Sequence, residues 1–224
     1  MHKFADDVTL VTKLENYNLI PDEIKNIENW ALANNLTLNK VKTKEIIFIK
    51  TKKDILPDPM DGIARVTSLK LLGVTLQNQL LMKEHVDSVI TKCTNMLYPM
   101  NILRSHGMKP EGLQEVYRSK ILSRVLYAAP AWWGLASKCD YNRIDAFLKR
   151  SKKCGFYPEE GKLFEELCID IDNRLLAKII NNKDHVLHQF LPHKKQHSYN
   201  LRQTRGHNFT LPIKDNRNFF NRTL

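Results

Sequence analysis

The stretch KEHVDSVITKCTNMLYPMNILRSHG, residues 83–107, carries the clearest periodic pattern in this 224-residue chain. Apolar side chains recur there at intervals of three and four residues, which places them on one face of a helix. The pattern predicts one long amphipathic helix that ends near Gly107. The apolar positions are Val86, Val89, Ile90, Cys93, Met96, Leu97, Met100 and Leu103.

The chain that follows this helix is also predicted to be mainly helical. A second helix is expected after Pro110, with five apolar residues on one side. Further helices are predicted over 141–154, 162–168 and 173–191, and the tail after Pro192 has no period and is expected to be extended or disordered. The apolar residues of the second helix are Leu113, Val116, Tyr117, Ile121 and Val125.

The chain that precedes the long helix has a different pattern. A helix should begin at Pro21, with Ile24, Ile27 and Ala31 facing inward, and should stop at Asn34–Asn35. A strand is predicted over 45–50. The segment 64–68 should pair back on it or lead into 71–76, which gives a small antiparallel sheet. The fold class is therefore α+β, with helices predominating after residue 80.

Residues 3–12, KFADDVTLVT, contain the paired carboxylates Asp6 and Asp7 followed by alternating apolar residues. This pattern predicts a hairpin that displays two acids at its tip. Adjacent carboxylates can bind Mg²⁺, which prefers oxygen ligands. Such pairs also occur in ordinary turns and at helix N-caps, so the stretch alone leaves both interpretations open.

Three motifs, taken in order and spacing, resemble the palm of reverse transcriptases from non-LTR (LINE-like, jockey or CR1-type) retrotransposons. They are the Asp6–Asp7 pair, the run NLTLNKVKT at 35–43 and the run LLGVTL at 71–76. The resemblance continues through YRS at 117–119, YAAPAW at 127–132, YNLR at 199–202 and NFTLP at 208–212. It implies a partial palm with a primer-grip hairpin over 1–80, a helical thumb over 81–155 and a helical C-terminal region with a basic tail over 156–224.

The resemblance implies RNA-templated DNA synthesis by two-metal phosphoryl transfer with Mg²⁺. Asp6 would be the main metal ligand and Asp7 its companion, while Lys42 would reach the incoming deoxynucleotide triphosphate. Leu72 and Gly73 would approach the DNA primer on its RNA template. Lys42 as an ordinary surface lysine, and Gly73 as a residue that only permits a tight turn, remain alternatives.

In this family a further catalytic aspartate and the fingers lie upstream of the acid pair. This chain starts at Met1, so it is expected to be a C-terminal fragment that is inactive alone. The alternatives are a non-catalytic nucleic-acid-binding module and an inert relic of a mobile element.

The net charge of +11 agrees with a nucleic-acid partner. Residues 1–80 hold 11 basic and 10 acidic side chains, whereas 81–224 hold 24 and 14. The second part is the expected binding surface, with a merely solvated basic face as the alternative. Its candidate contacts are Lys149, Arg150, Lys152, Lys153, Lys194, Lys195, Arg202 and Arg205.

No apolar run is long enough to cross a bilayer and no signal pattern begins the chain, so an intracellular location, nuclear or cytoplasmic, is expected. The cysteines lack the spacing of a zinc site or a disulfide framework, and we interpret them as small apolar packing residues. Trp132 and Trp133 are predicted to pack against helices, with base stacking as the alternative. The cysteines are Cys93, Cys139, Cys154 and Cys168.

Overall fold

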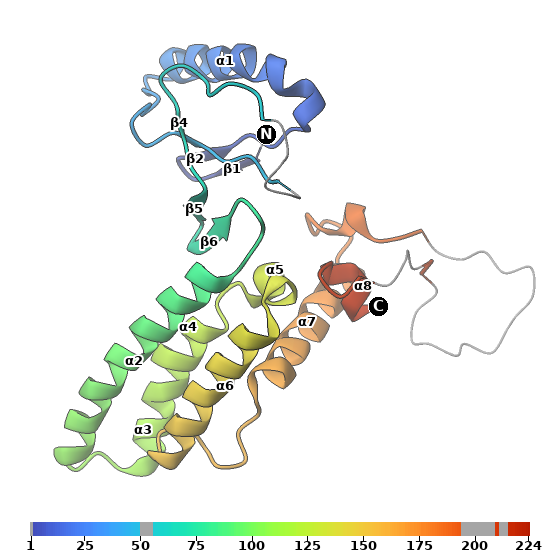
Figure 1. The fold of residues 1–224 in the computed structure, drawn as a ribbon. Helices are drawn as coiled ribbons and strands as arrows, with labels where there is room; N and C mark the ends of the chain where they lie inside the picture. The colour runs from blue at the N-terminus through green and yellow to red at the C-terminus, as the bar shows by residue number, and fades with distance from the viewer. Residues whose placement is uncertain (1, 50–55, 194–208, 211–214) are drawn as a thin grey trace, which may run out of the picture. The chain divides into compact units, whose positions relative to one another are not determined.

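The computed structural model describes residues 2–49, 56–193, 209–210 and 215–224 (Figure 1). These residues form an α+β fold in which helices predominate. The chain divides into two compact units, Met1–Leu69 and Lys70–Leu224. None of the described helices is long and apolar enough to span a membrane.

The first unit contains two short pairs of strands. The strands β1 (His2–Phe4) and β2 (Asp7–Thr9) form an antiparallel hairpin, as predicted. The strands β3 (Lys44–Glu45) and β4 (Ala64–Arg65) pair in parallel, so the expected antiparallel sheet is wrong at this point. The predicted strand at 45–50 is also too long, because residues 46–49 form no strand and find no neighbouring strand among the described residues. The apolar residues 46–49 by themselves are typical of a longer strand.

The helix α1 (Ile20–Ala33) confirms the helix predicted from Pro21, and a 3₁₀ helix, η1 (Leu14–Leu19), precedes it. Pro21 stands in the first turn of α1, where the carboxylates of Asp22 and Glu23 interact favourably with the positive end of the helix dipole. Asn34 is the C-cap of the helix. Ala31 faces inward and is the only buried hydrophobic residue among the described residues of this unit.

Charged side chains take the place of an apolar core in the first unit. The Arg65 guanidinium bonds to the Glu45 carboxylate (Nε to Oε2, 2.5 Å), to the Pro57 carbonyl (2.6 Å) and to the Tyr17 hydroxyl (2.8 Å). Glu45 is buried and Arg65 is largely so. This network, which we call the Arg65 network, joins β3, β4, η1 and the loop at 57–58.

The second unit is a helical bundle in which consecutive long helices run in opposite directions (Figure 1). The boundary between the units falls inside β5 (Ser68–Leu71), which forms a hairpin with β6 (Val74–Gln77). The bundle comprises α2 (Lys83–Ser105), the continuous helical run of α3 (Pro110–Val116), η2 (Tyr117–Leu122) and α4 (Ser123–Val125), then α6 (Lys138–Lys153) and α7 (Phe164–Asn181).

The core of the bundle confirms both predicted amphipathic helices. The apolar faces of α2 and of the α3–α4 run meet at residues that are almost completely buried. The short helices α5 (Ala129–Trp132) and η3 (Trp133–Leu135) add two tryptophans, which pack as predicted. Buried side chains of this core are Val86, Val89, Cys93, Met100, Leu113, Tyr117, Ile121, Val125, Trp132, Ile144, Phe147, Leu148, Phe164 and Cys168. Cys139 is exposed, so its prediction as a packing residue is wrong.

The C-terminal part of the chain corrects two predictions. The helices predicted over 162–168 and 173–191 are one helix, α7, followed by the 3₁₀ turn η4 (His188–Phe190). The tail, predicted to be irregular, ends in α8 (Phe219–Thr223), which packs on α7. Periodicity missed this helix because a single buried ion pair, Arg222 to Asp172 (2.7 Å), fixes it.

Arg222 is the centre of this attachment. Its guanidinium also donates to the Pro130 carbonyl (2.7 Å) and lies 4.7 Å from the ring centroid of Trp133. The Trp133 indole in turn donates to Asp172 (2.8 Å). Gly134 leaves room for the arginine, because a Cβ there would collide with the guanidinium.

Candidate nucleic-acid interface

The acid-pair hairpin of the first unit presents both carboxylates to solvent. Ala5 and Asp6 form its two-residue turn, and Asp7 begins β2 opposite Phe4. Ala5 has a positive φ of 53°, which an L-residue adopts only at a cost. The Lys3 ammonium on β1 lies 4.4 Å from the ring centroid of Trp30, a cation–π contact that connects β1 to α1.

The donor chemistry of this tip suits Mg²⁺, which binds proteins through one or two carboxylates and keeps water or phosphate oxygens as its other ligands. Within the described part of the chain, no group of three or more His, Cys, Asp or Glu side chains gathers at one point. Asp6 and Asp7 therefore fit a portion of a two-metal site, and the described residues add no third carboxylate to it.

In the Asn39–Thr43 segment, hydrogen bonds to Asn39 fix the turn that carries Lys42. The Asn39 side-chain oxygen and carbonyl both accept the Lys42 amide (3.1 Å each). The Asn39 carbonyl also accepts the amide and the hydroxyl of Thr43 (3.0 and 2.9 Å). The turn is thus fixed by its own side chains, and it leaves the Lys42 side chain exposed. Lys40 points elsewhere and pairs with Glu28 on α1 (2.8 Å).

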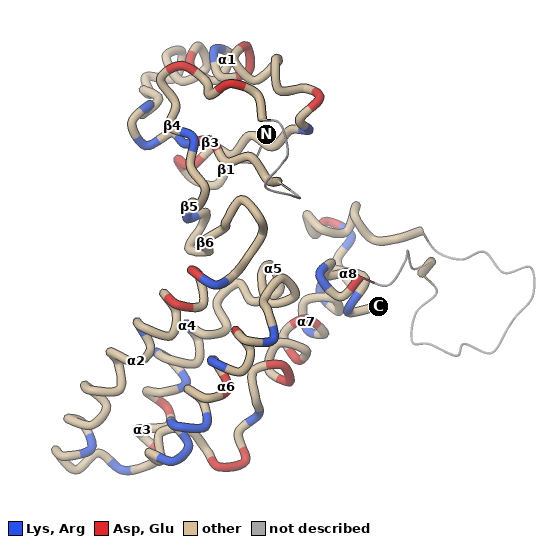
Figure 2. The backbone as a smooth tube through the Cα atoms, viewed as in Figure 1, with Lys and Arg blue, Asp and Glu red and all other residues tan. Residues whose placement is uncertain are grey.

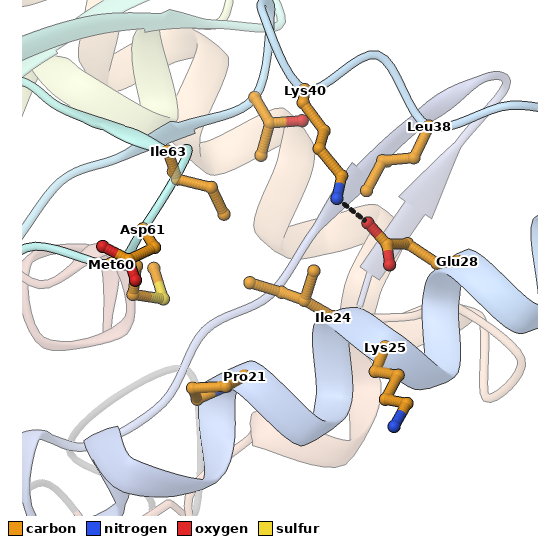
Figure 3. A pocket seen from close by; sticks show the side chains of 10 residues that line it. Pro21, Ile24, Lys25, Glu28, Leu38, Lys40, Met60, Asp61 and Ile63 are labelled. Atoms are coloured by element: carbon orange, nitrogen blue, oxygen red, sulfur yellow. Dashed lines mark ion pairs between the residues drawn. The ribbon is translucent and has the colours of Figure 1, made fainter.

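A pocket of ≈ 430 Å³ lies beside this turn (Figure 3). Ile24, Leu38 and Ile63 give it apolar walls, and the Lys40–Glu28 ion pair borders it. Sequence reasoning missed the pocket because its walls come from three separated segments, around 21–28, 38–43 and 60–63.

The Leu72–Gly73 turn joins β5 to β6 in the second unit. Both residues have positive φ, 45° and 91°, the pattern of a type I′ hairpin turn. Leucine is poorly suited to this backbone region. The Leu72 side chain is also 45% exposed. The Tyr127 hydroxyl donates to the Leu72 carbonyl (3.1 Å), a contact between residues 55 positions apart that no sequence pattern indicates.

A buried histidine holds β6 close to the turn. The Thr75 amide donates to His85 Nδ1 (3.3 Å), which joins β6 to α2, and the His85 ring meets Trp132 edge-on at 4.7 Å. His85 Nε2 is buried and finds no hydrogen-bond partner among the described residues. Burial lowers the pKa of His85, and the charges of Lys92 and Lys70 lower it further. The imidazole is therefore favoured in its neutral form.

The basic cluster at the end of α6 is divided by its contacts. Lys149, Arg150 and Lys153 are exposed, and Figure 2 shows Lys and Arg gathered at this end of the helix. The Lys152 ammonium instead donates to the carbonyls of Glu159 and Gly161 (2.9 and 2.5 Å), so it closes the loop after α6. The other predicted contacts, Lys194, Lys195, Arg202 and Arg205, lie outside the described residues.

Comparison with known proteins finds one distant relationship to report. No family model matches the chain, and no solved structure matches it. A probable RNA-directed DNA polymerase from transposon BS of Drosophila melanogaster is 24% identical over 184 residues, which cover 73% of this chain and 20% of that protein. The chain thus spans about a fifth of the length of that relative, and it is distantly similar to a non-LTR transposon reverse transcriptase.

Proposed function

We propose that this chain is the part of a non-LTR retrotransposon RNA-directed DNA polymerase that contacts the primer, comprising the end of the palm and the thumb. The distant similarity to the transposon BS polymerase supports this, as does the order of the acid-pair hairpin, the Asn39 turn and the β5–β6 hairpin. Its substrates would be a DNA primer annealed to an RNA template and, in a complete enzyme, deoxynucleotide triphosphates.

The observation that carries the proposal is the β5–β6 tip, where the strained Leu72 stands beside Gly73 in the hairpin that the family resemblance assigns to the primer. A non-glycine residue with positive φ costs on the order of 1 kcal/mol, and asparagine would occupy this turn position more easily. Strained, exposed residues concentrate at functional sites, where the surrounding structure enforces them. Leu72 is 45% exposed, so its side chain is available to a primer strand.

The first unit would contribute the metal ligands. Asp6 and Asp7 would hold Mg²⁺, which when bound supplies Lewis-acid activation and charge neutralisation. The Asn39 turn would present the exposed Lys42 ammonium to the triphosphate, where a fixed positive charge stabilises developing negative charge. Lys149, Arg150 and Lys153 would contact phosphates of the duplex, with little dependence on sequence.

The test is binding of a fluorescent DNA primer on an RNA template with a recessed 3′ end, compared with a blunt duplex of the same length. We expect the wild-type chain to prefer the recessed end, and Leu72→Asn to lose most of that preference while the melting temperature stays equal or rises. Leu80→Asn is the matched control, because Leu80 also has positive φ (55°) and is 40% exposed.

Two outcomes would contradict the proposal. One is a wild-type chain without preference for the recessed end, and the other is Leu72→Asn binding that equals wild type. Salt-sensitive binding to every duplex alike would instead favour a non-catalytic nucleic-acid-binding module, the alternative suggested by the net charge of +10 after residue 80.

A further inference from the structure

Tyr127 makes two contacts with the tip of the β5–β6 hairpin although its side chain is 55% exposed. Its hydroxyl donates to the Leu72 carbonyl at 3.1 Å. Its ring lies against Gly73 so closely that a Cβ there would be 2.9 Å from Tyr127 Cε1. The glycine is therefore required twice, by its φ of 91° and by the tyrosine ring.

The main chain of Tyr127 is held from inside the bundle. Its carbonyl accepts the indole N–H of Trp132 (3.0 Å), and Trp132 is fully buried. The next residue, Ala128, has a positive φ of 49° and turns the chain from the end of α4 into α5. The buried core thus fixes the point from which the tyrosine side chain reaches the hairpin.

The hairpin needs such a support. Two-stranded ribbons are marginally stable by themselves, and this one carries a strained leucine at its turn. The Thr75–His85 bond anchors β6 near its start, and Tyr127 is the contact at the tip itself.

The surface beside the tip suits a nucleic-acid strand. Lys120 and Arg124 lie four residues apart on the helical run, Tyr127 follows three residues later in the turn after α4, and all three are exposed. Two cations and an aromatic ring combine charge for phosphates with a face on which a base can stack.

We infer that Tyr127 is a positioning residue that fixes the Leu72–Gly73 tip to the end of α4, so that the tip and the Lys120–Arg124–Tyr127 stripe act as one surface for the 3′ end of a nucleic-acid strand. The substrate part rests on the proposed function. The positioning part stands on the two contacts alone.

Hydrogen exchange of the full chain tests the positioning part. Tyr127→Phe removes one hydrogen bond, so the amides of the hairpin tip should exchange about fivefold faster while those of α2 and α6 do not change. Tyr98→Phe is the matched control, because Tyr98 is an exposed tyrosine on α2. Tip exchange in Tyr127→Phe equal to wild type would overturn the inference.

Binding tests the substrate part. In Tyr127→Ala the preference for a recessed 3′ end over a blunt duplex should fall about tenfold, while the dependence of blunt-duplex binding on salt stays as in wild type. If tip exchange accelerates but the preference is retained, the positioning part holds and the substrate part of the inference is wrong. If the wild-type chain shows no preference at all, the proposed function fails instead, and the exchange experiment still decides the positioning role.

Discussion

Different interactions stabilise each of the two units of this chain. No large apolar residue among the described residues of the first unit is buried, and the Arg65 network connects its strands, whereas the second unit buries a continuous apolar core. Exposed apolar residues of the first unit include Phe4, Val11, Leu14, Leu19, Trp30, Leu32, Leu36, Val41 and Phe48. The candidate catalytic carboxylates therefore lie on the less stably packed unit, and the basic surface lies on the unit with the apolar core.

The largest expected effect concerns catalysis. The 224-residue chain should not extend a primer on an RNA template, even with Mg²⁺ and all four deoxynucleotides. Two-metal chemistry needs preorganised ligands from separate strands, and the described residues offer only Asp6 and Asp7 at the tip. The rate of primer extension should be several orders of magnitude below that of a complete polymerase. Template-dependent incorporation that Asp6→Ala abolishes would show that this view of the first unit is wrong.

The Arg65 network gives the next largest effect. Arg65→Met should destabilise the first unit by about 3 kcal/mol, because it leaves the buried Glu45 carboxylate without its partner. Hydrogen exchange should then accelerate in α1 but not in α2. Lys40→Met is the control, since the partly exposed Lys40–Glu28 pair contributes at most about 1 kcal/mol. Equal effects of both changes would show that the buried Arg65 network stabilises the first unit no more than a partly exposed ion pair does.

Proteolysis of the wild-type chain sharpens the comparison without any mutation. Limited digestion should remove roughly the first seventy residues before it cuts the bundle, at a rate about tenfold higher or more, because local opening costs less where little apolar surface is buried. Mass spectrometry of the fragments measures the order of cleavage. A first unit that outlasts the bundle would contradict this account.

Charge reversal probes the second unit with a smaller effect. Changing Lys149, Arg150 and Lys153 together to glutamate should weaken duplex binding about tenfold in low salt and leave the melting temperature almost unchanged. Lys152→Glu alone should lower the melting temperature, because Lys152 closes the loop through Glu159 and Gly161. Unaltered binding by the triple variant would exclude this cluster from the interface.

The smallest effect is the pH dependence of the bundle. Burial lowers the folded-state pKa of His85, so the unfolded chain binds the proton more readily. Stability from this residue is complete above the unfolded pKa of about 6.5 and is lost as the pH falls below it, by at most about 1.4 kcal/mol per pH unit. His85→Asn should flatten this part of a plot of unfolding free energy against pH, and an unchanged slope would contradict this assignment.

Sequence predicted the structure well where apolar periodicity decides it. The face of α2 was predicted residue by residue, and α1 was predicted from Pro21 to Asn34. The same reasoning failed over 45–50, where the apolar run has no strand to pair with, and over 64–65, where the pairing is parallel. Strand partners depend on the path of the chain, which local patterns do not contain.

Single long-range polar contacts escaped prediction for a related reason. The bonds Arg65 to Glu45, Arg222 to Asp172 and Tyr127 to Leu72 connect residues 20, 50 and 55 positions apart. One pair of residues leaves no period in a sequence. The roles of Asp6, Asp7 and Lys42 rest on the family resemblance and stay predictions, because no hydrogen bond or ion pair of their side chains with another described residue sets them apart from other exposed residues.

Gly134 has a consequence for how this sequence can evolve. Any side chain at position 134 would occupy the space of the Arg222 guanidinium and press on the carbonyls of Asn216 and Arg217. A lineage that replaces Arg222 would remove the nearest of these obstacles at position 134 and leave the Asp172 carboxylate buried without its cation. Positions 134, 172 and 222 should therefore change together in related sequences. Relatives that keep all three residues are expected to keep α8 packed on α7.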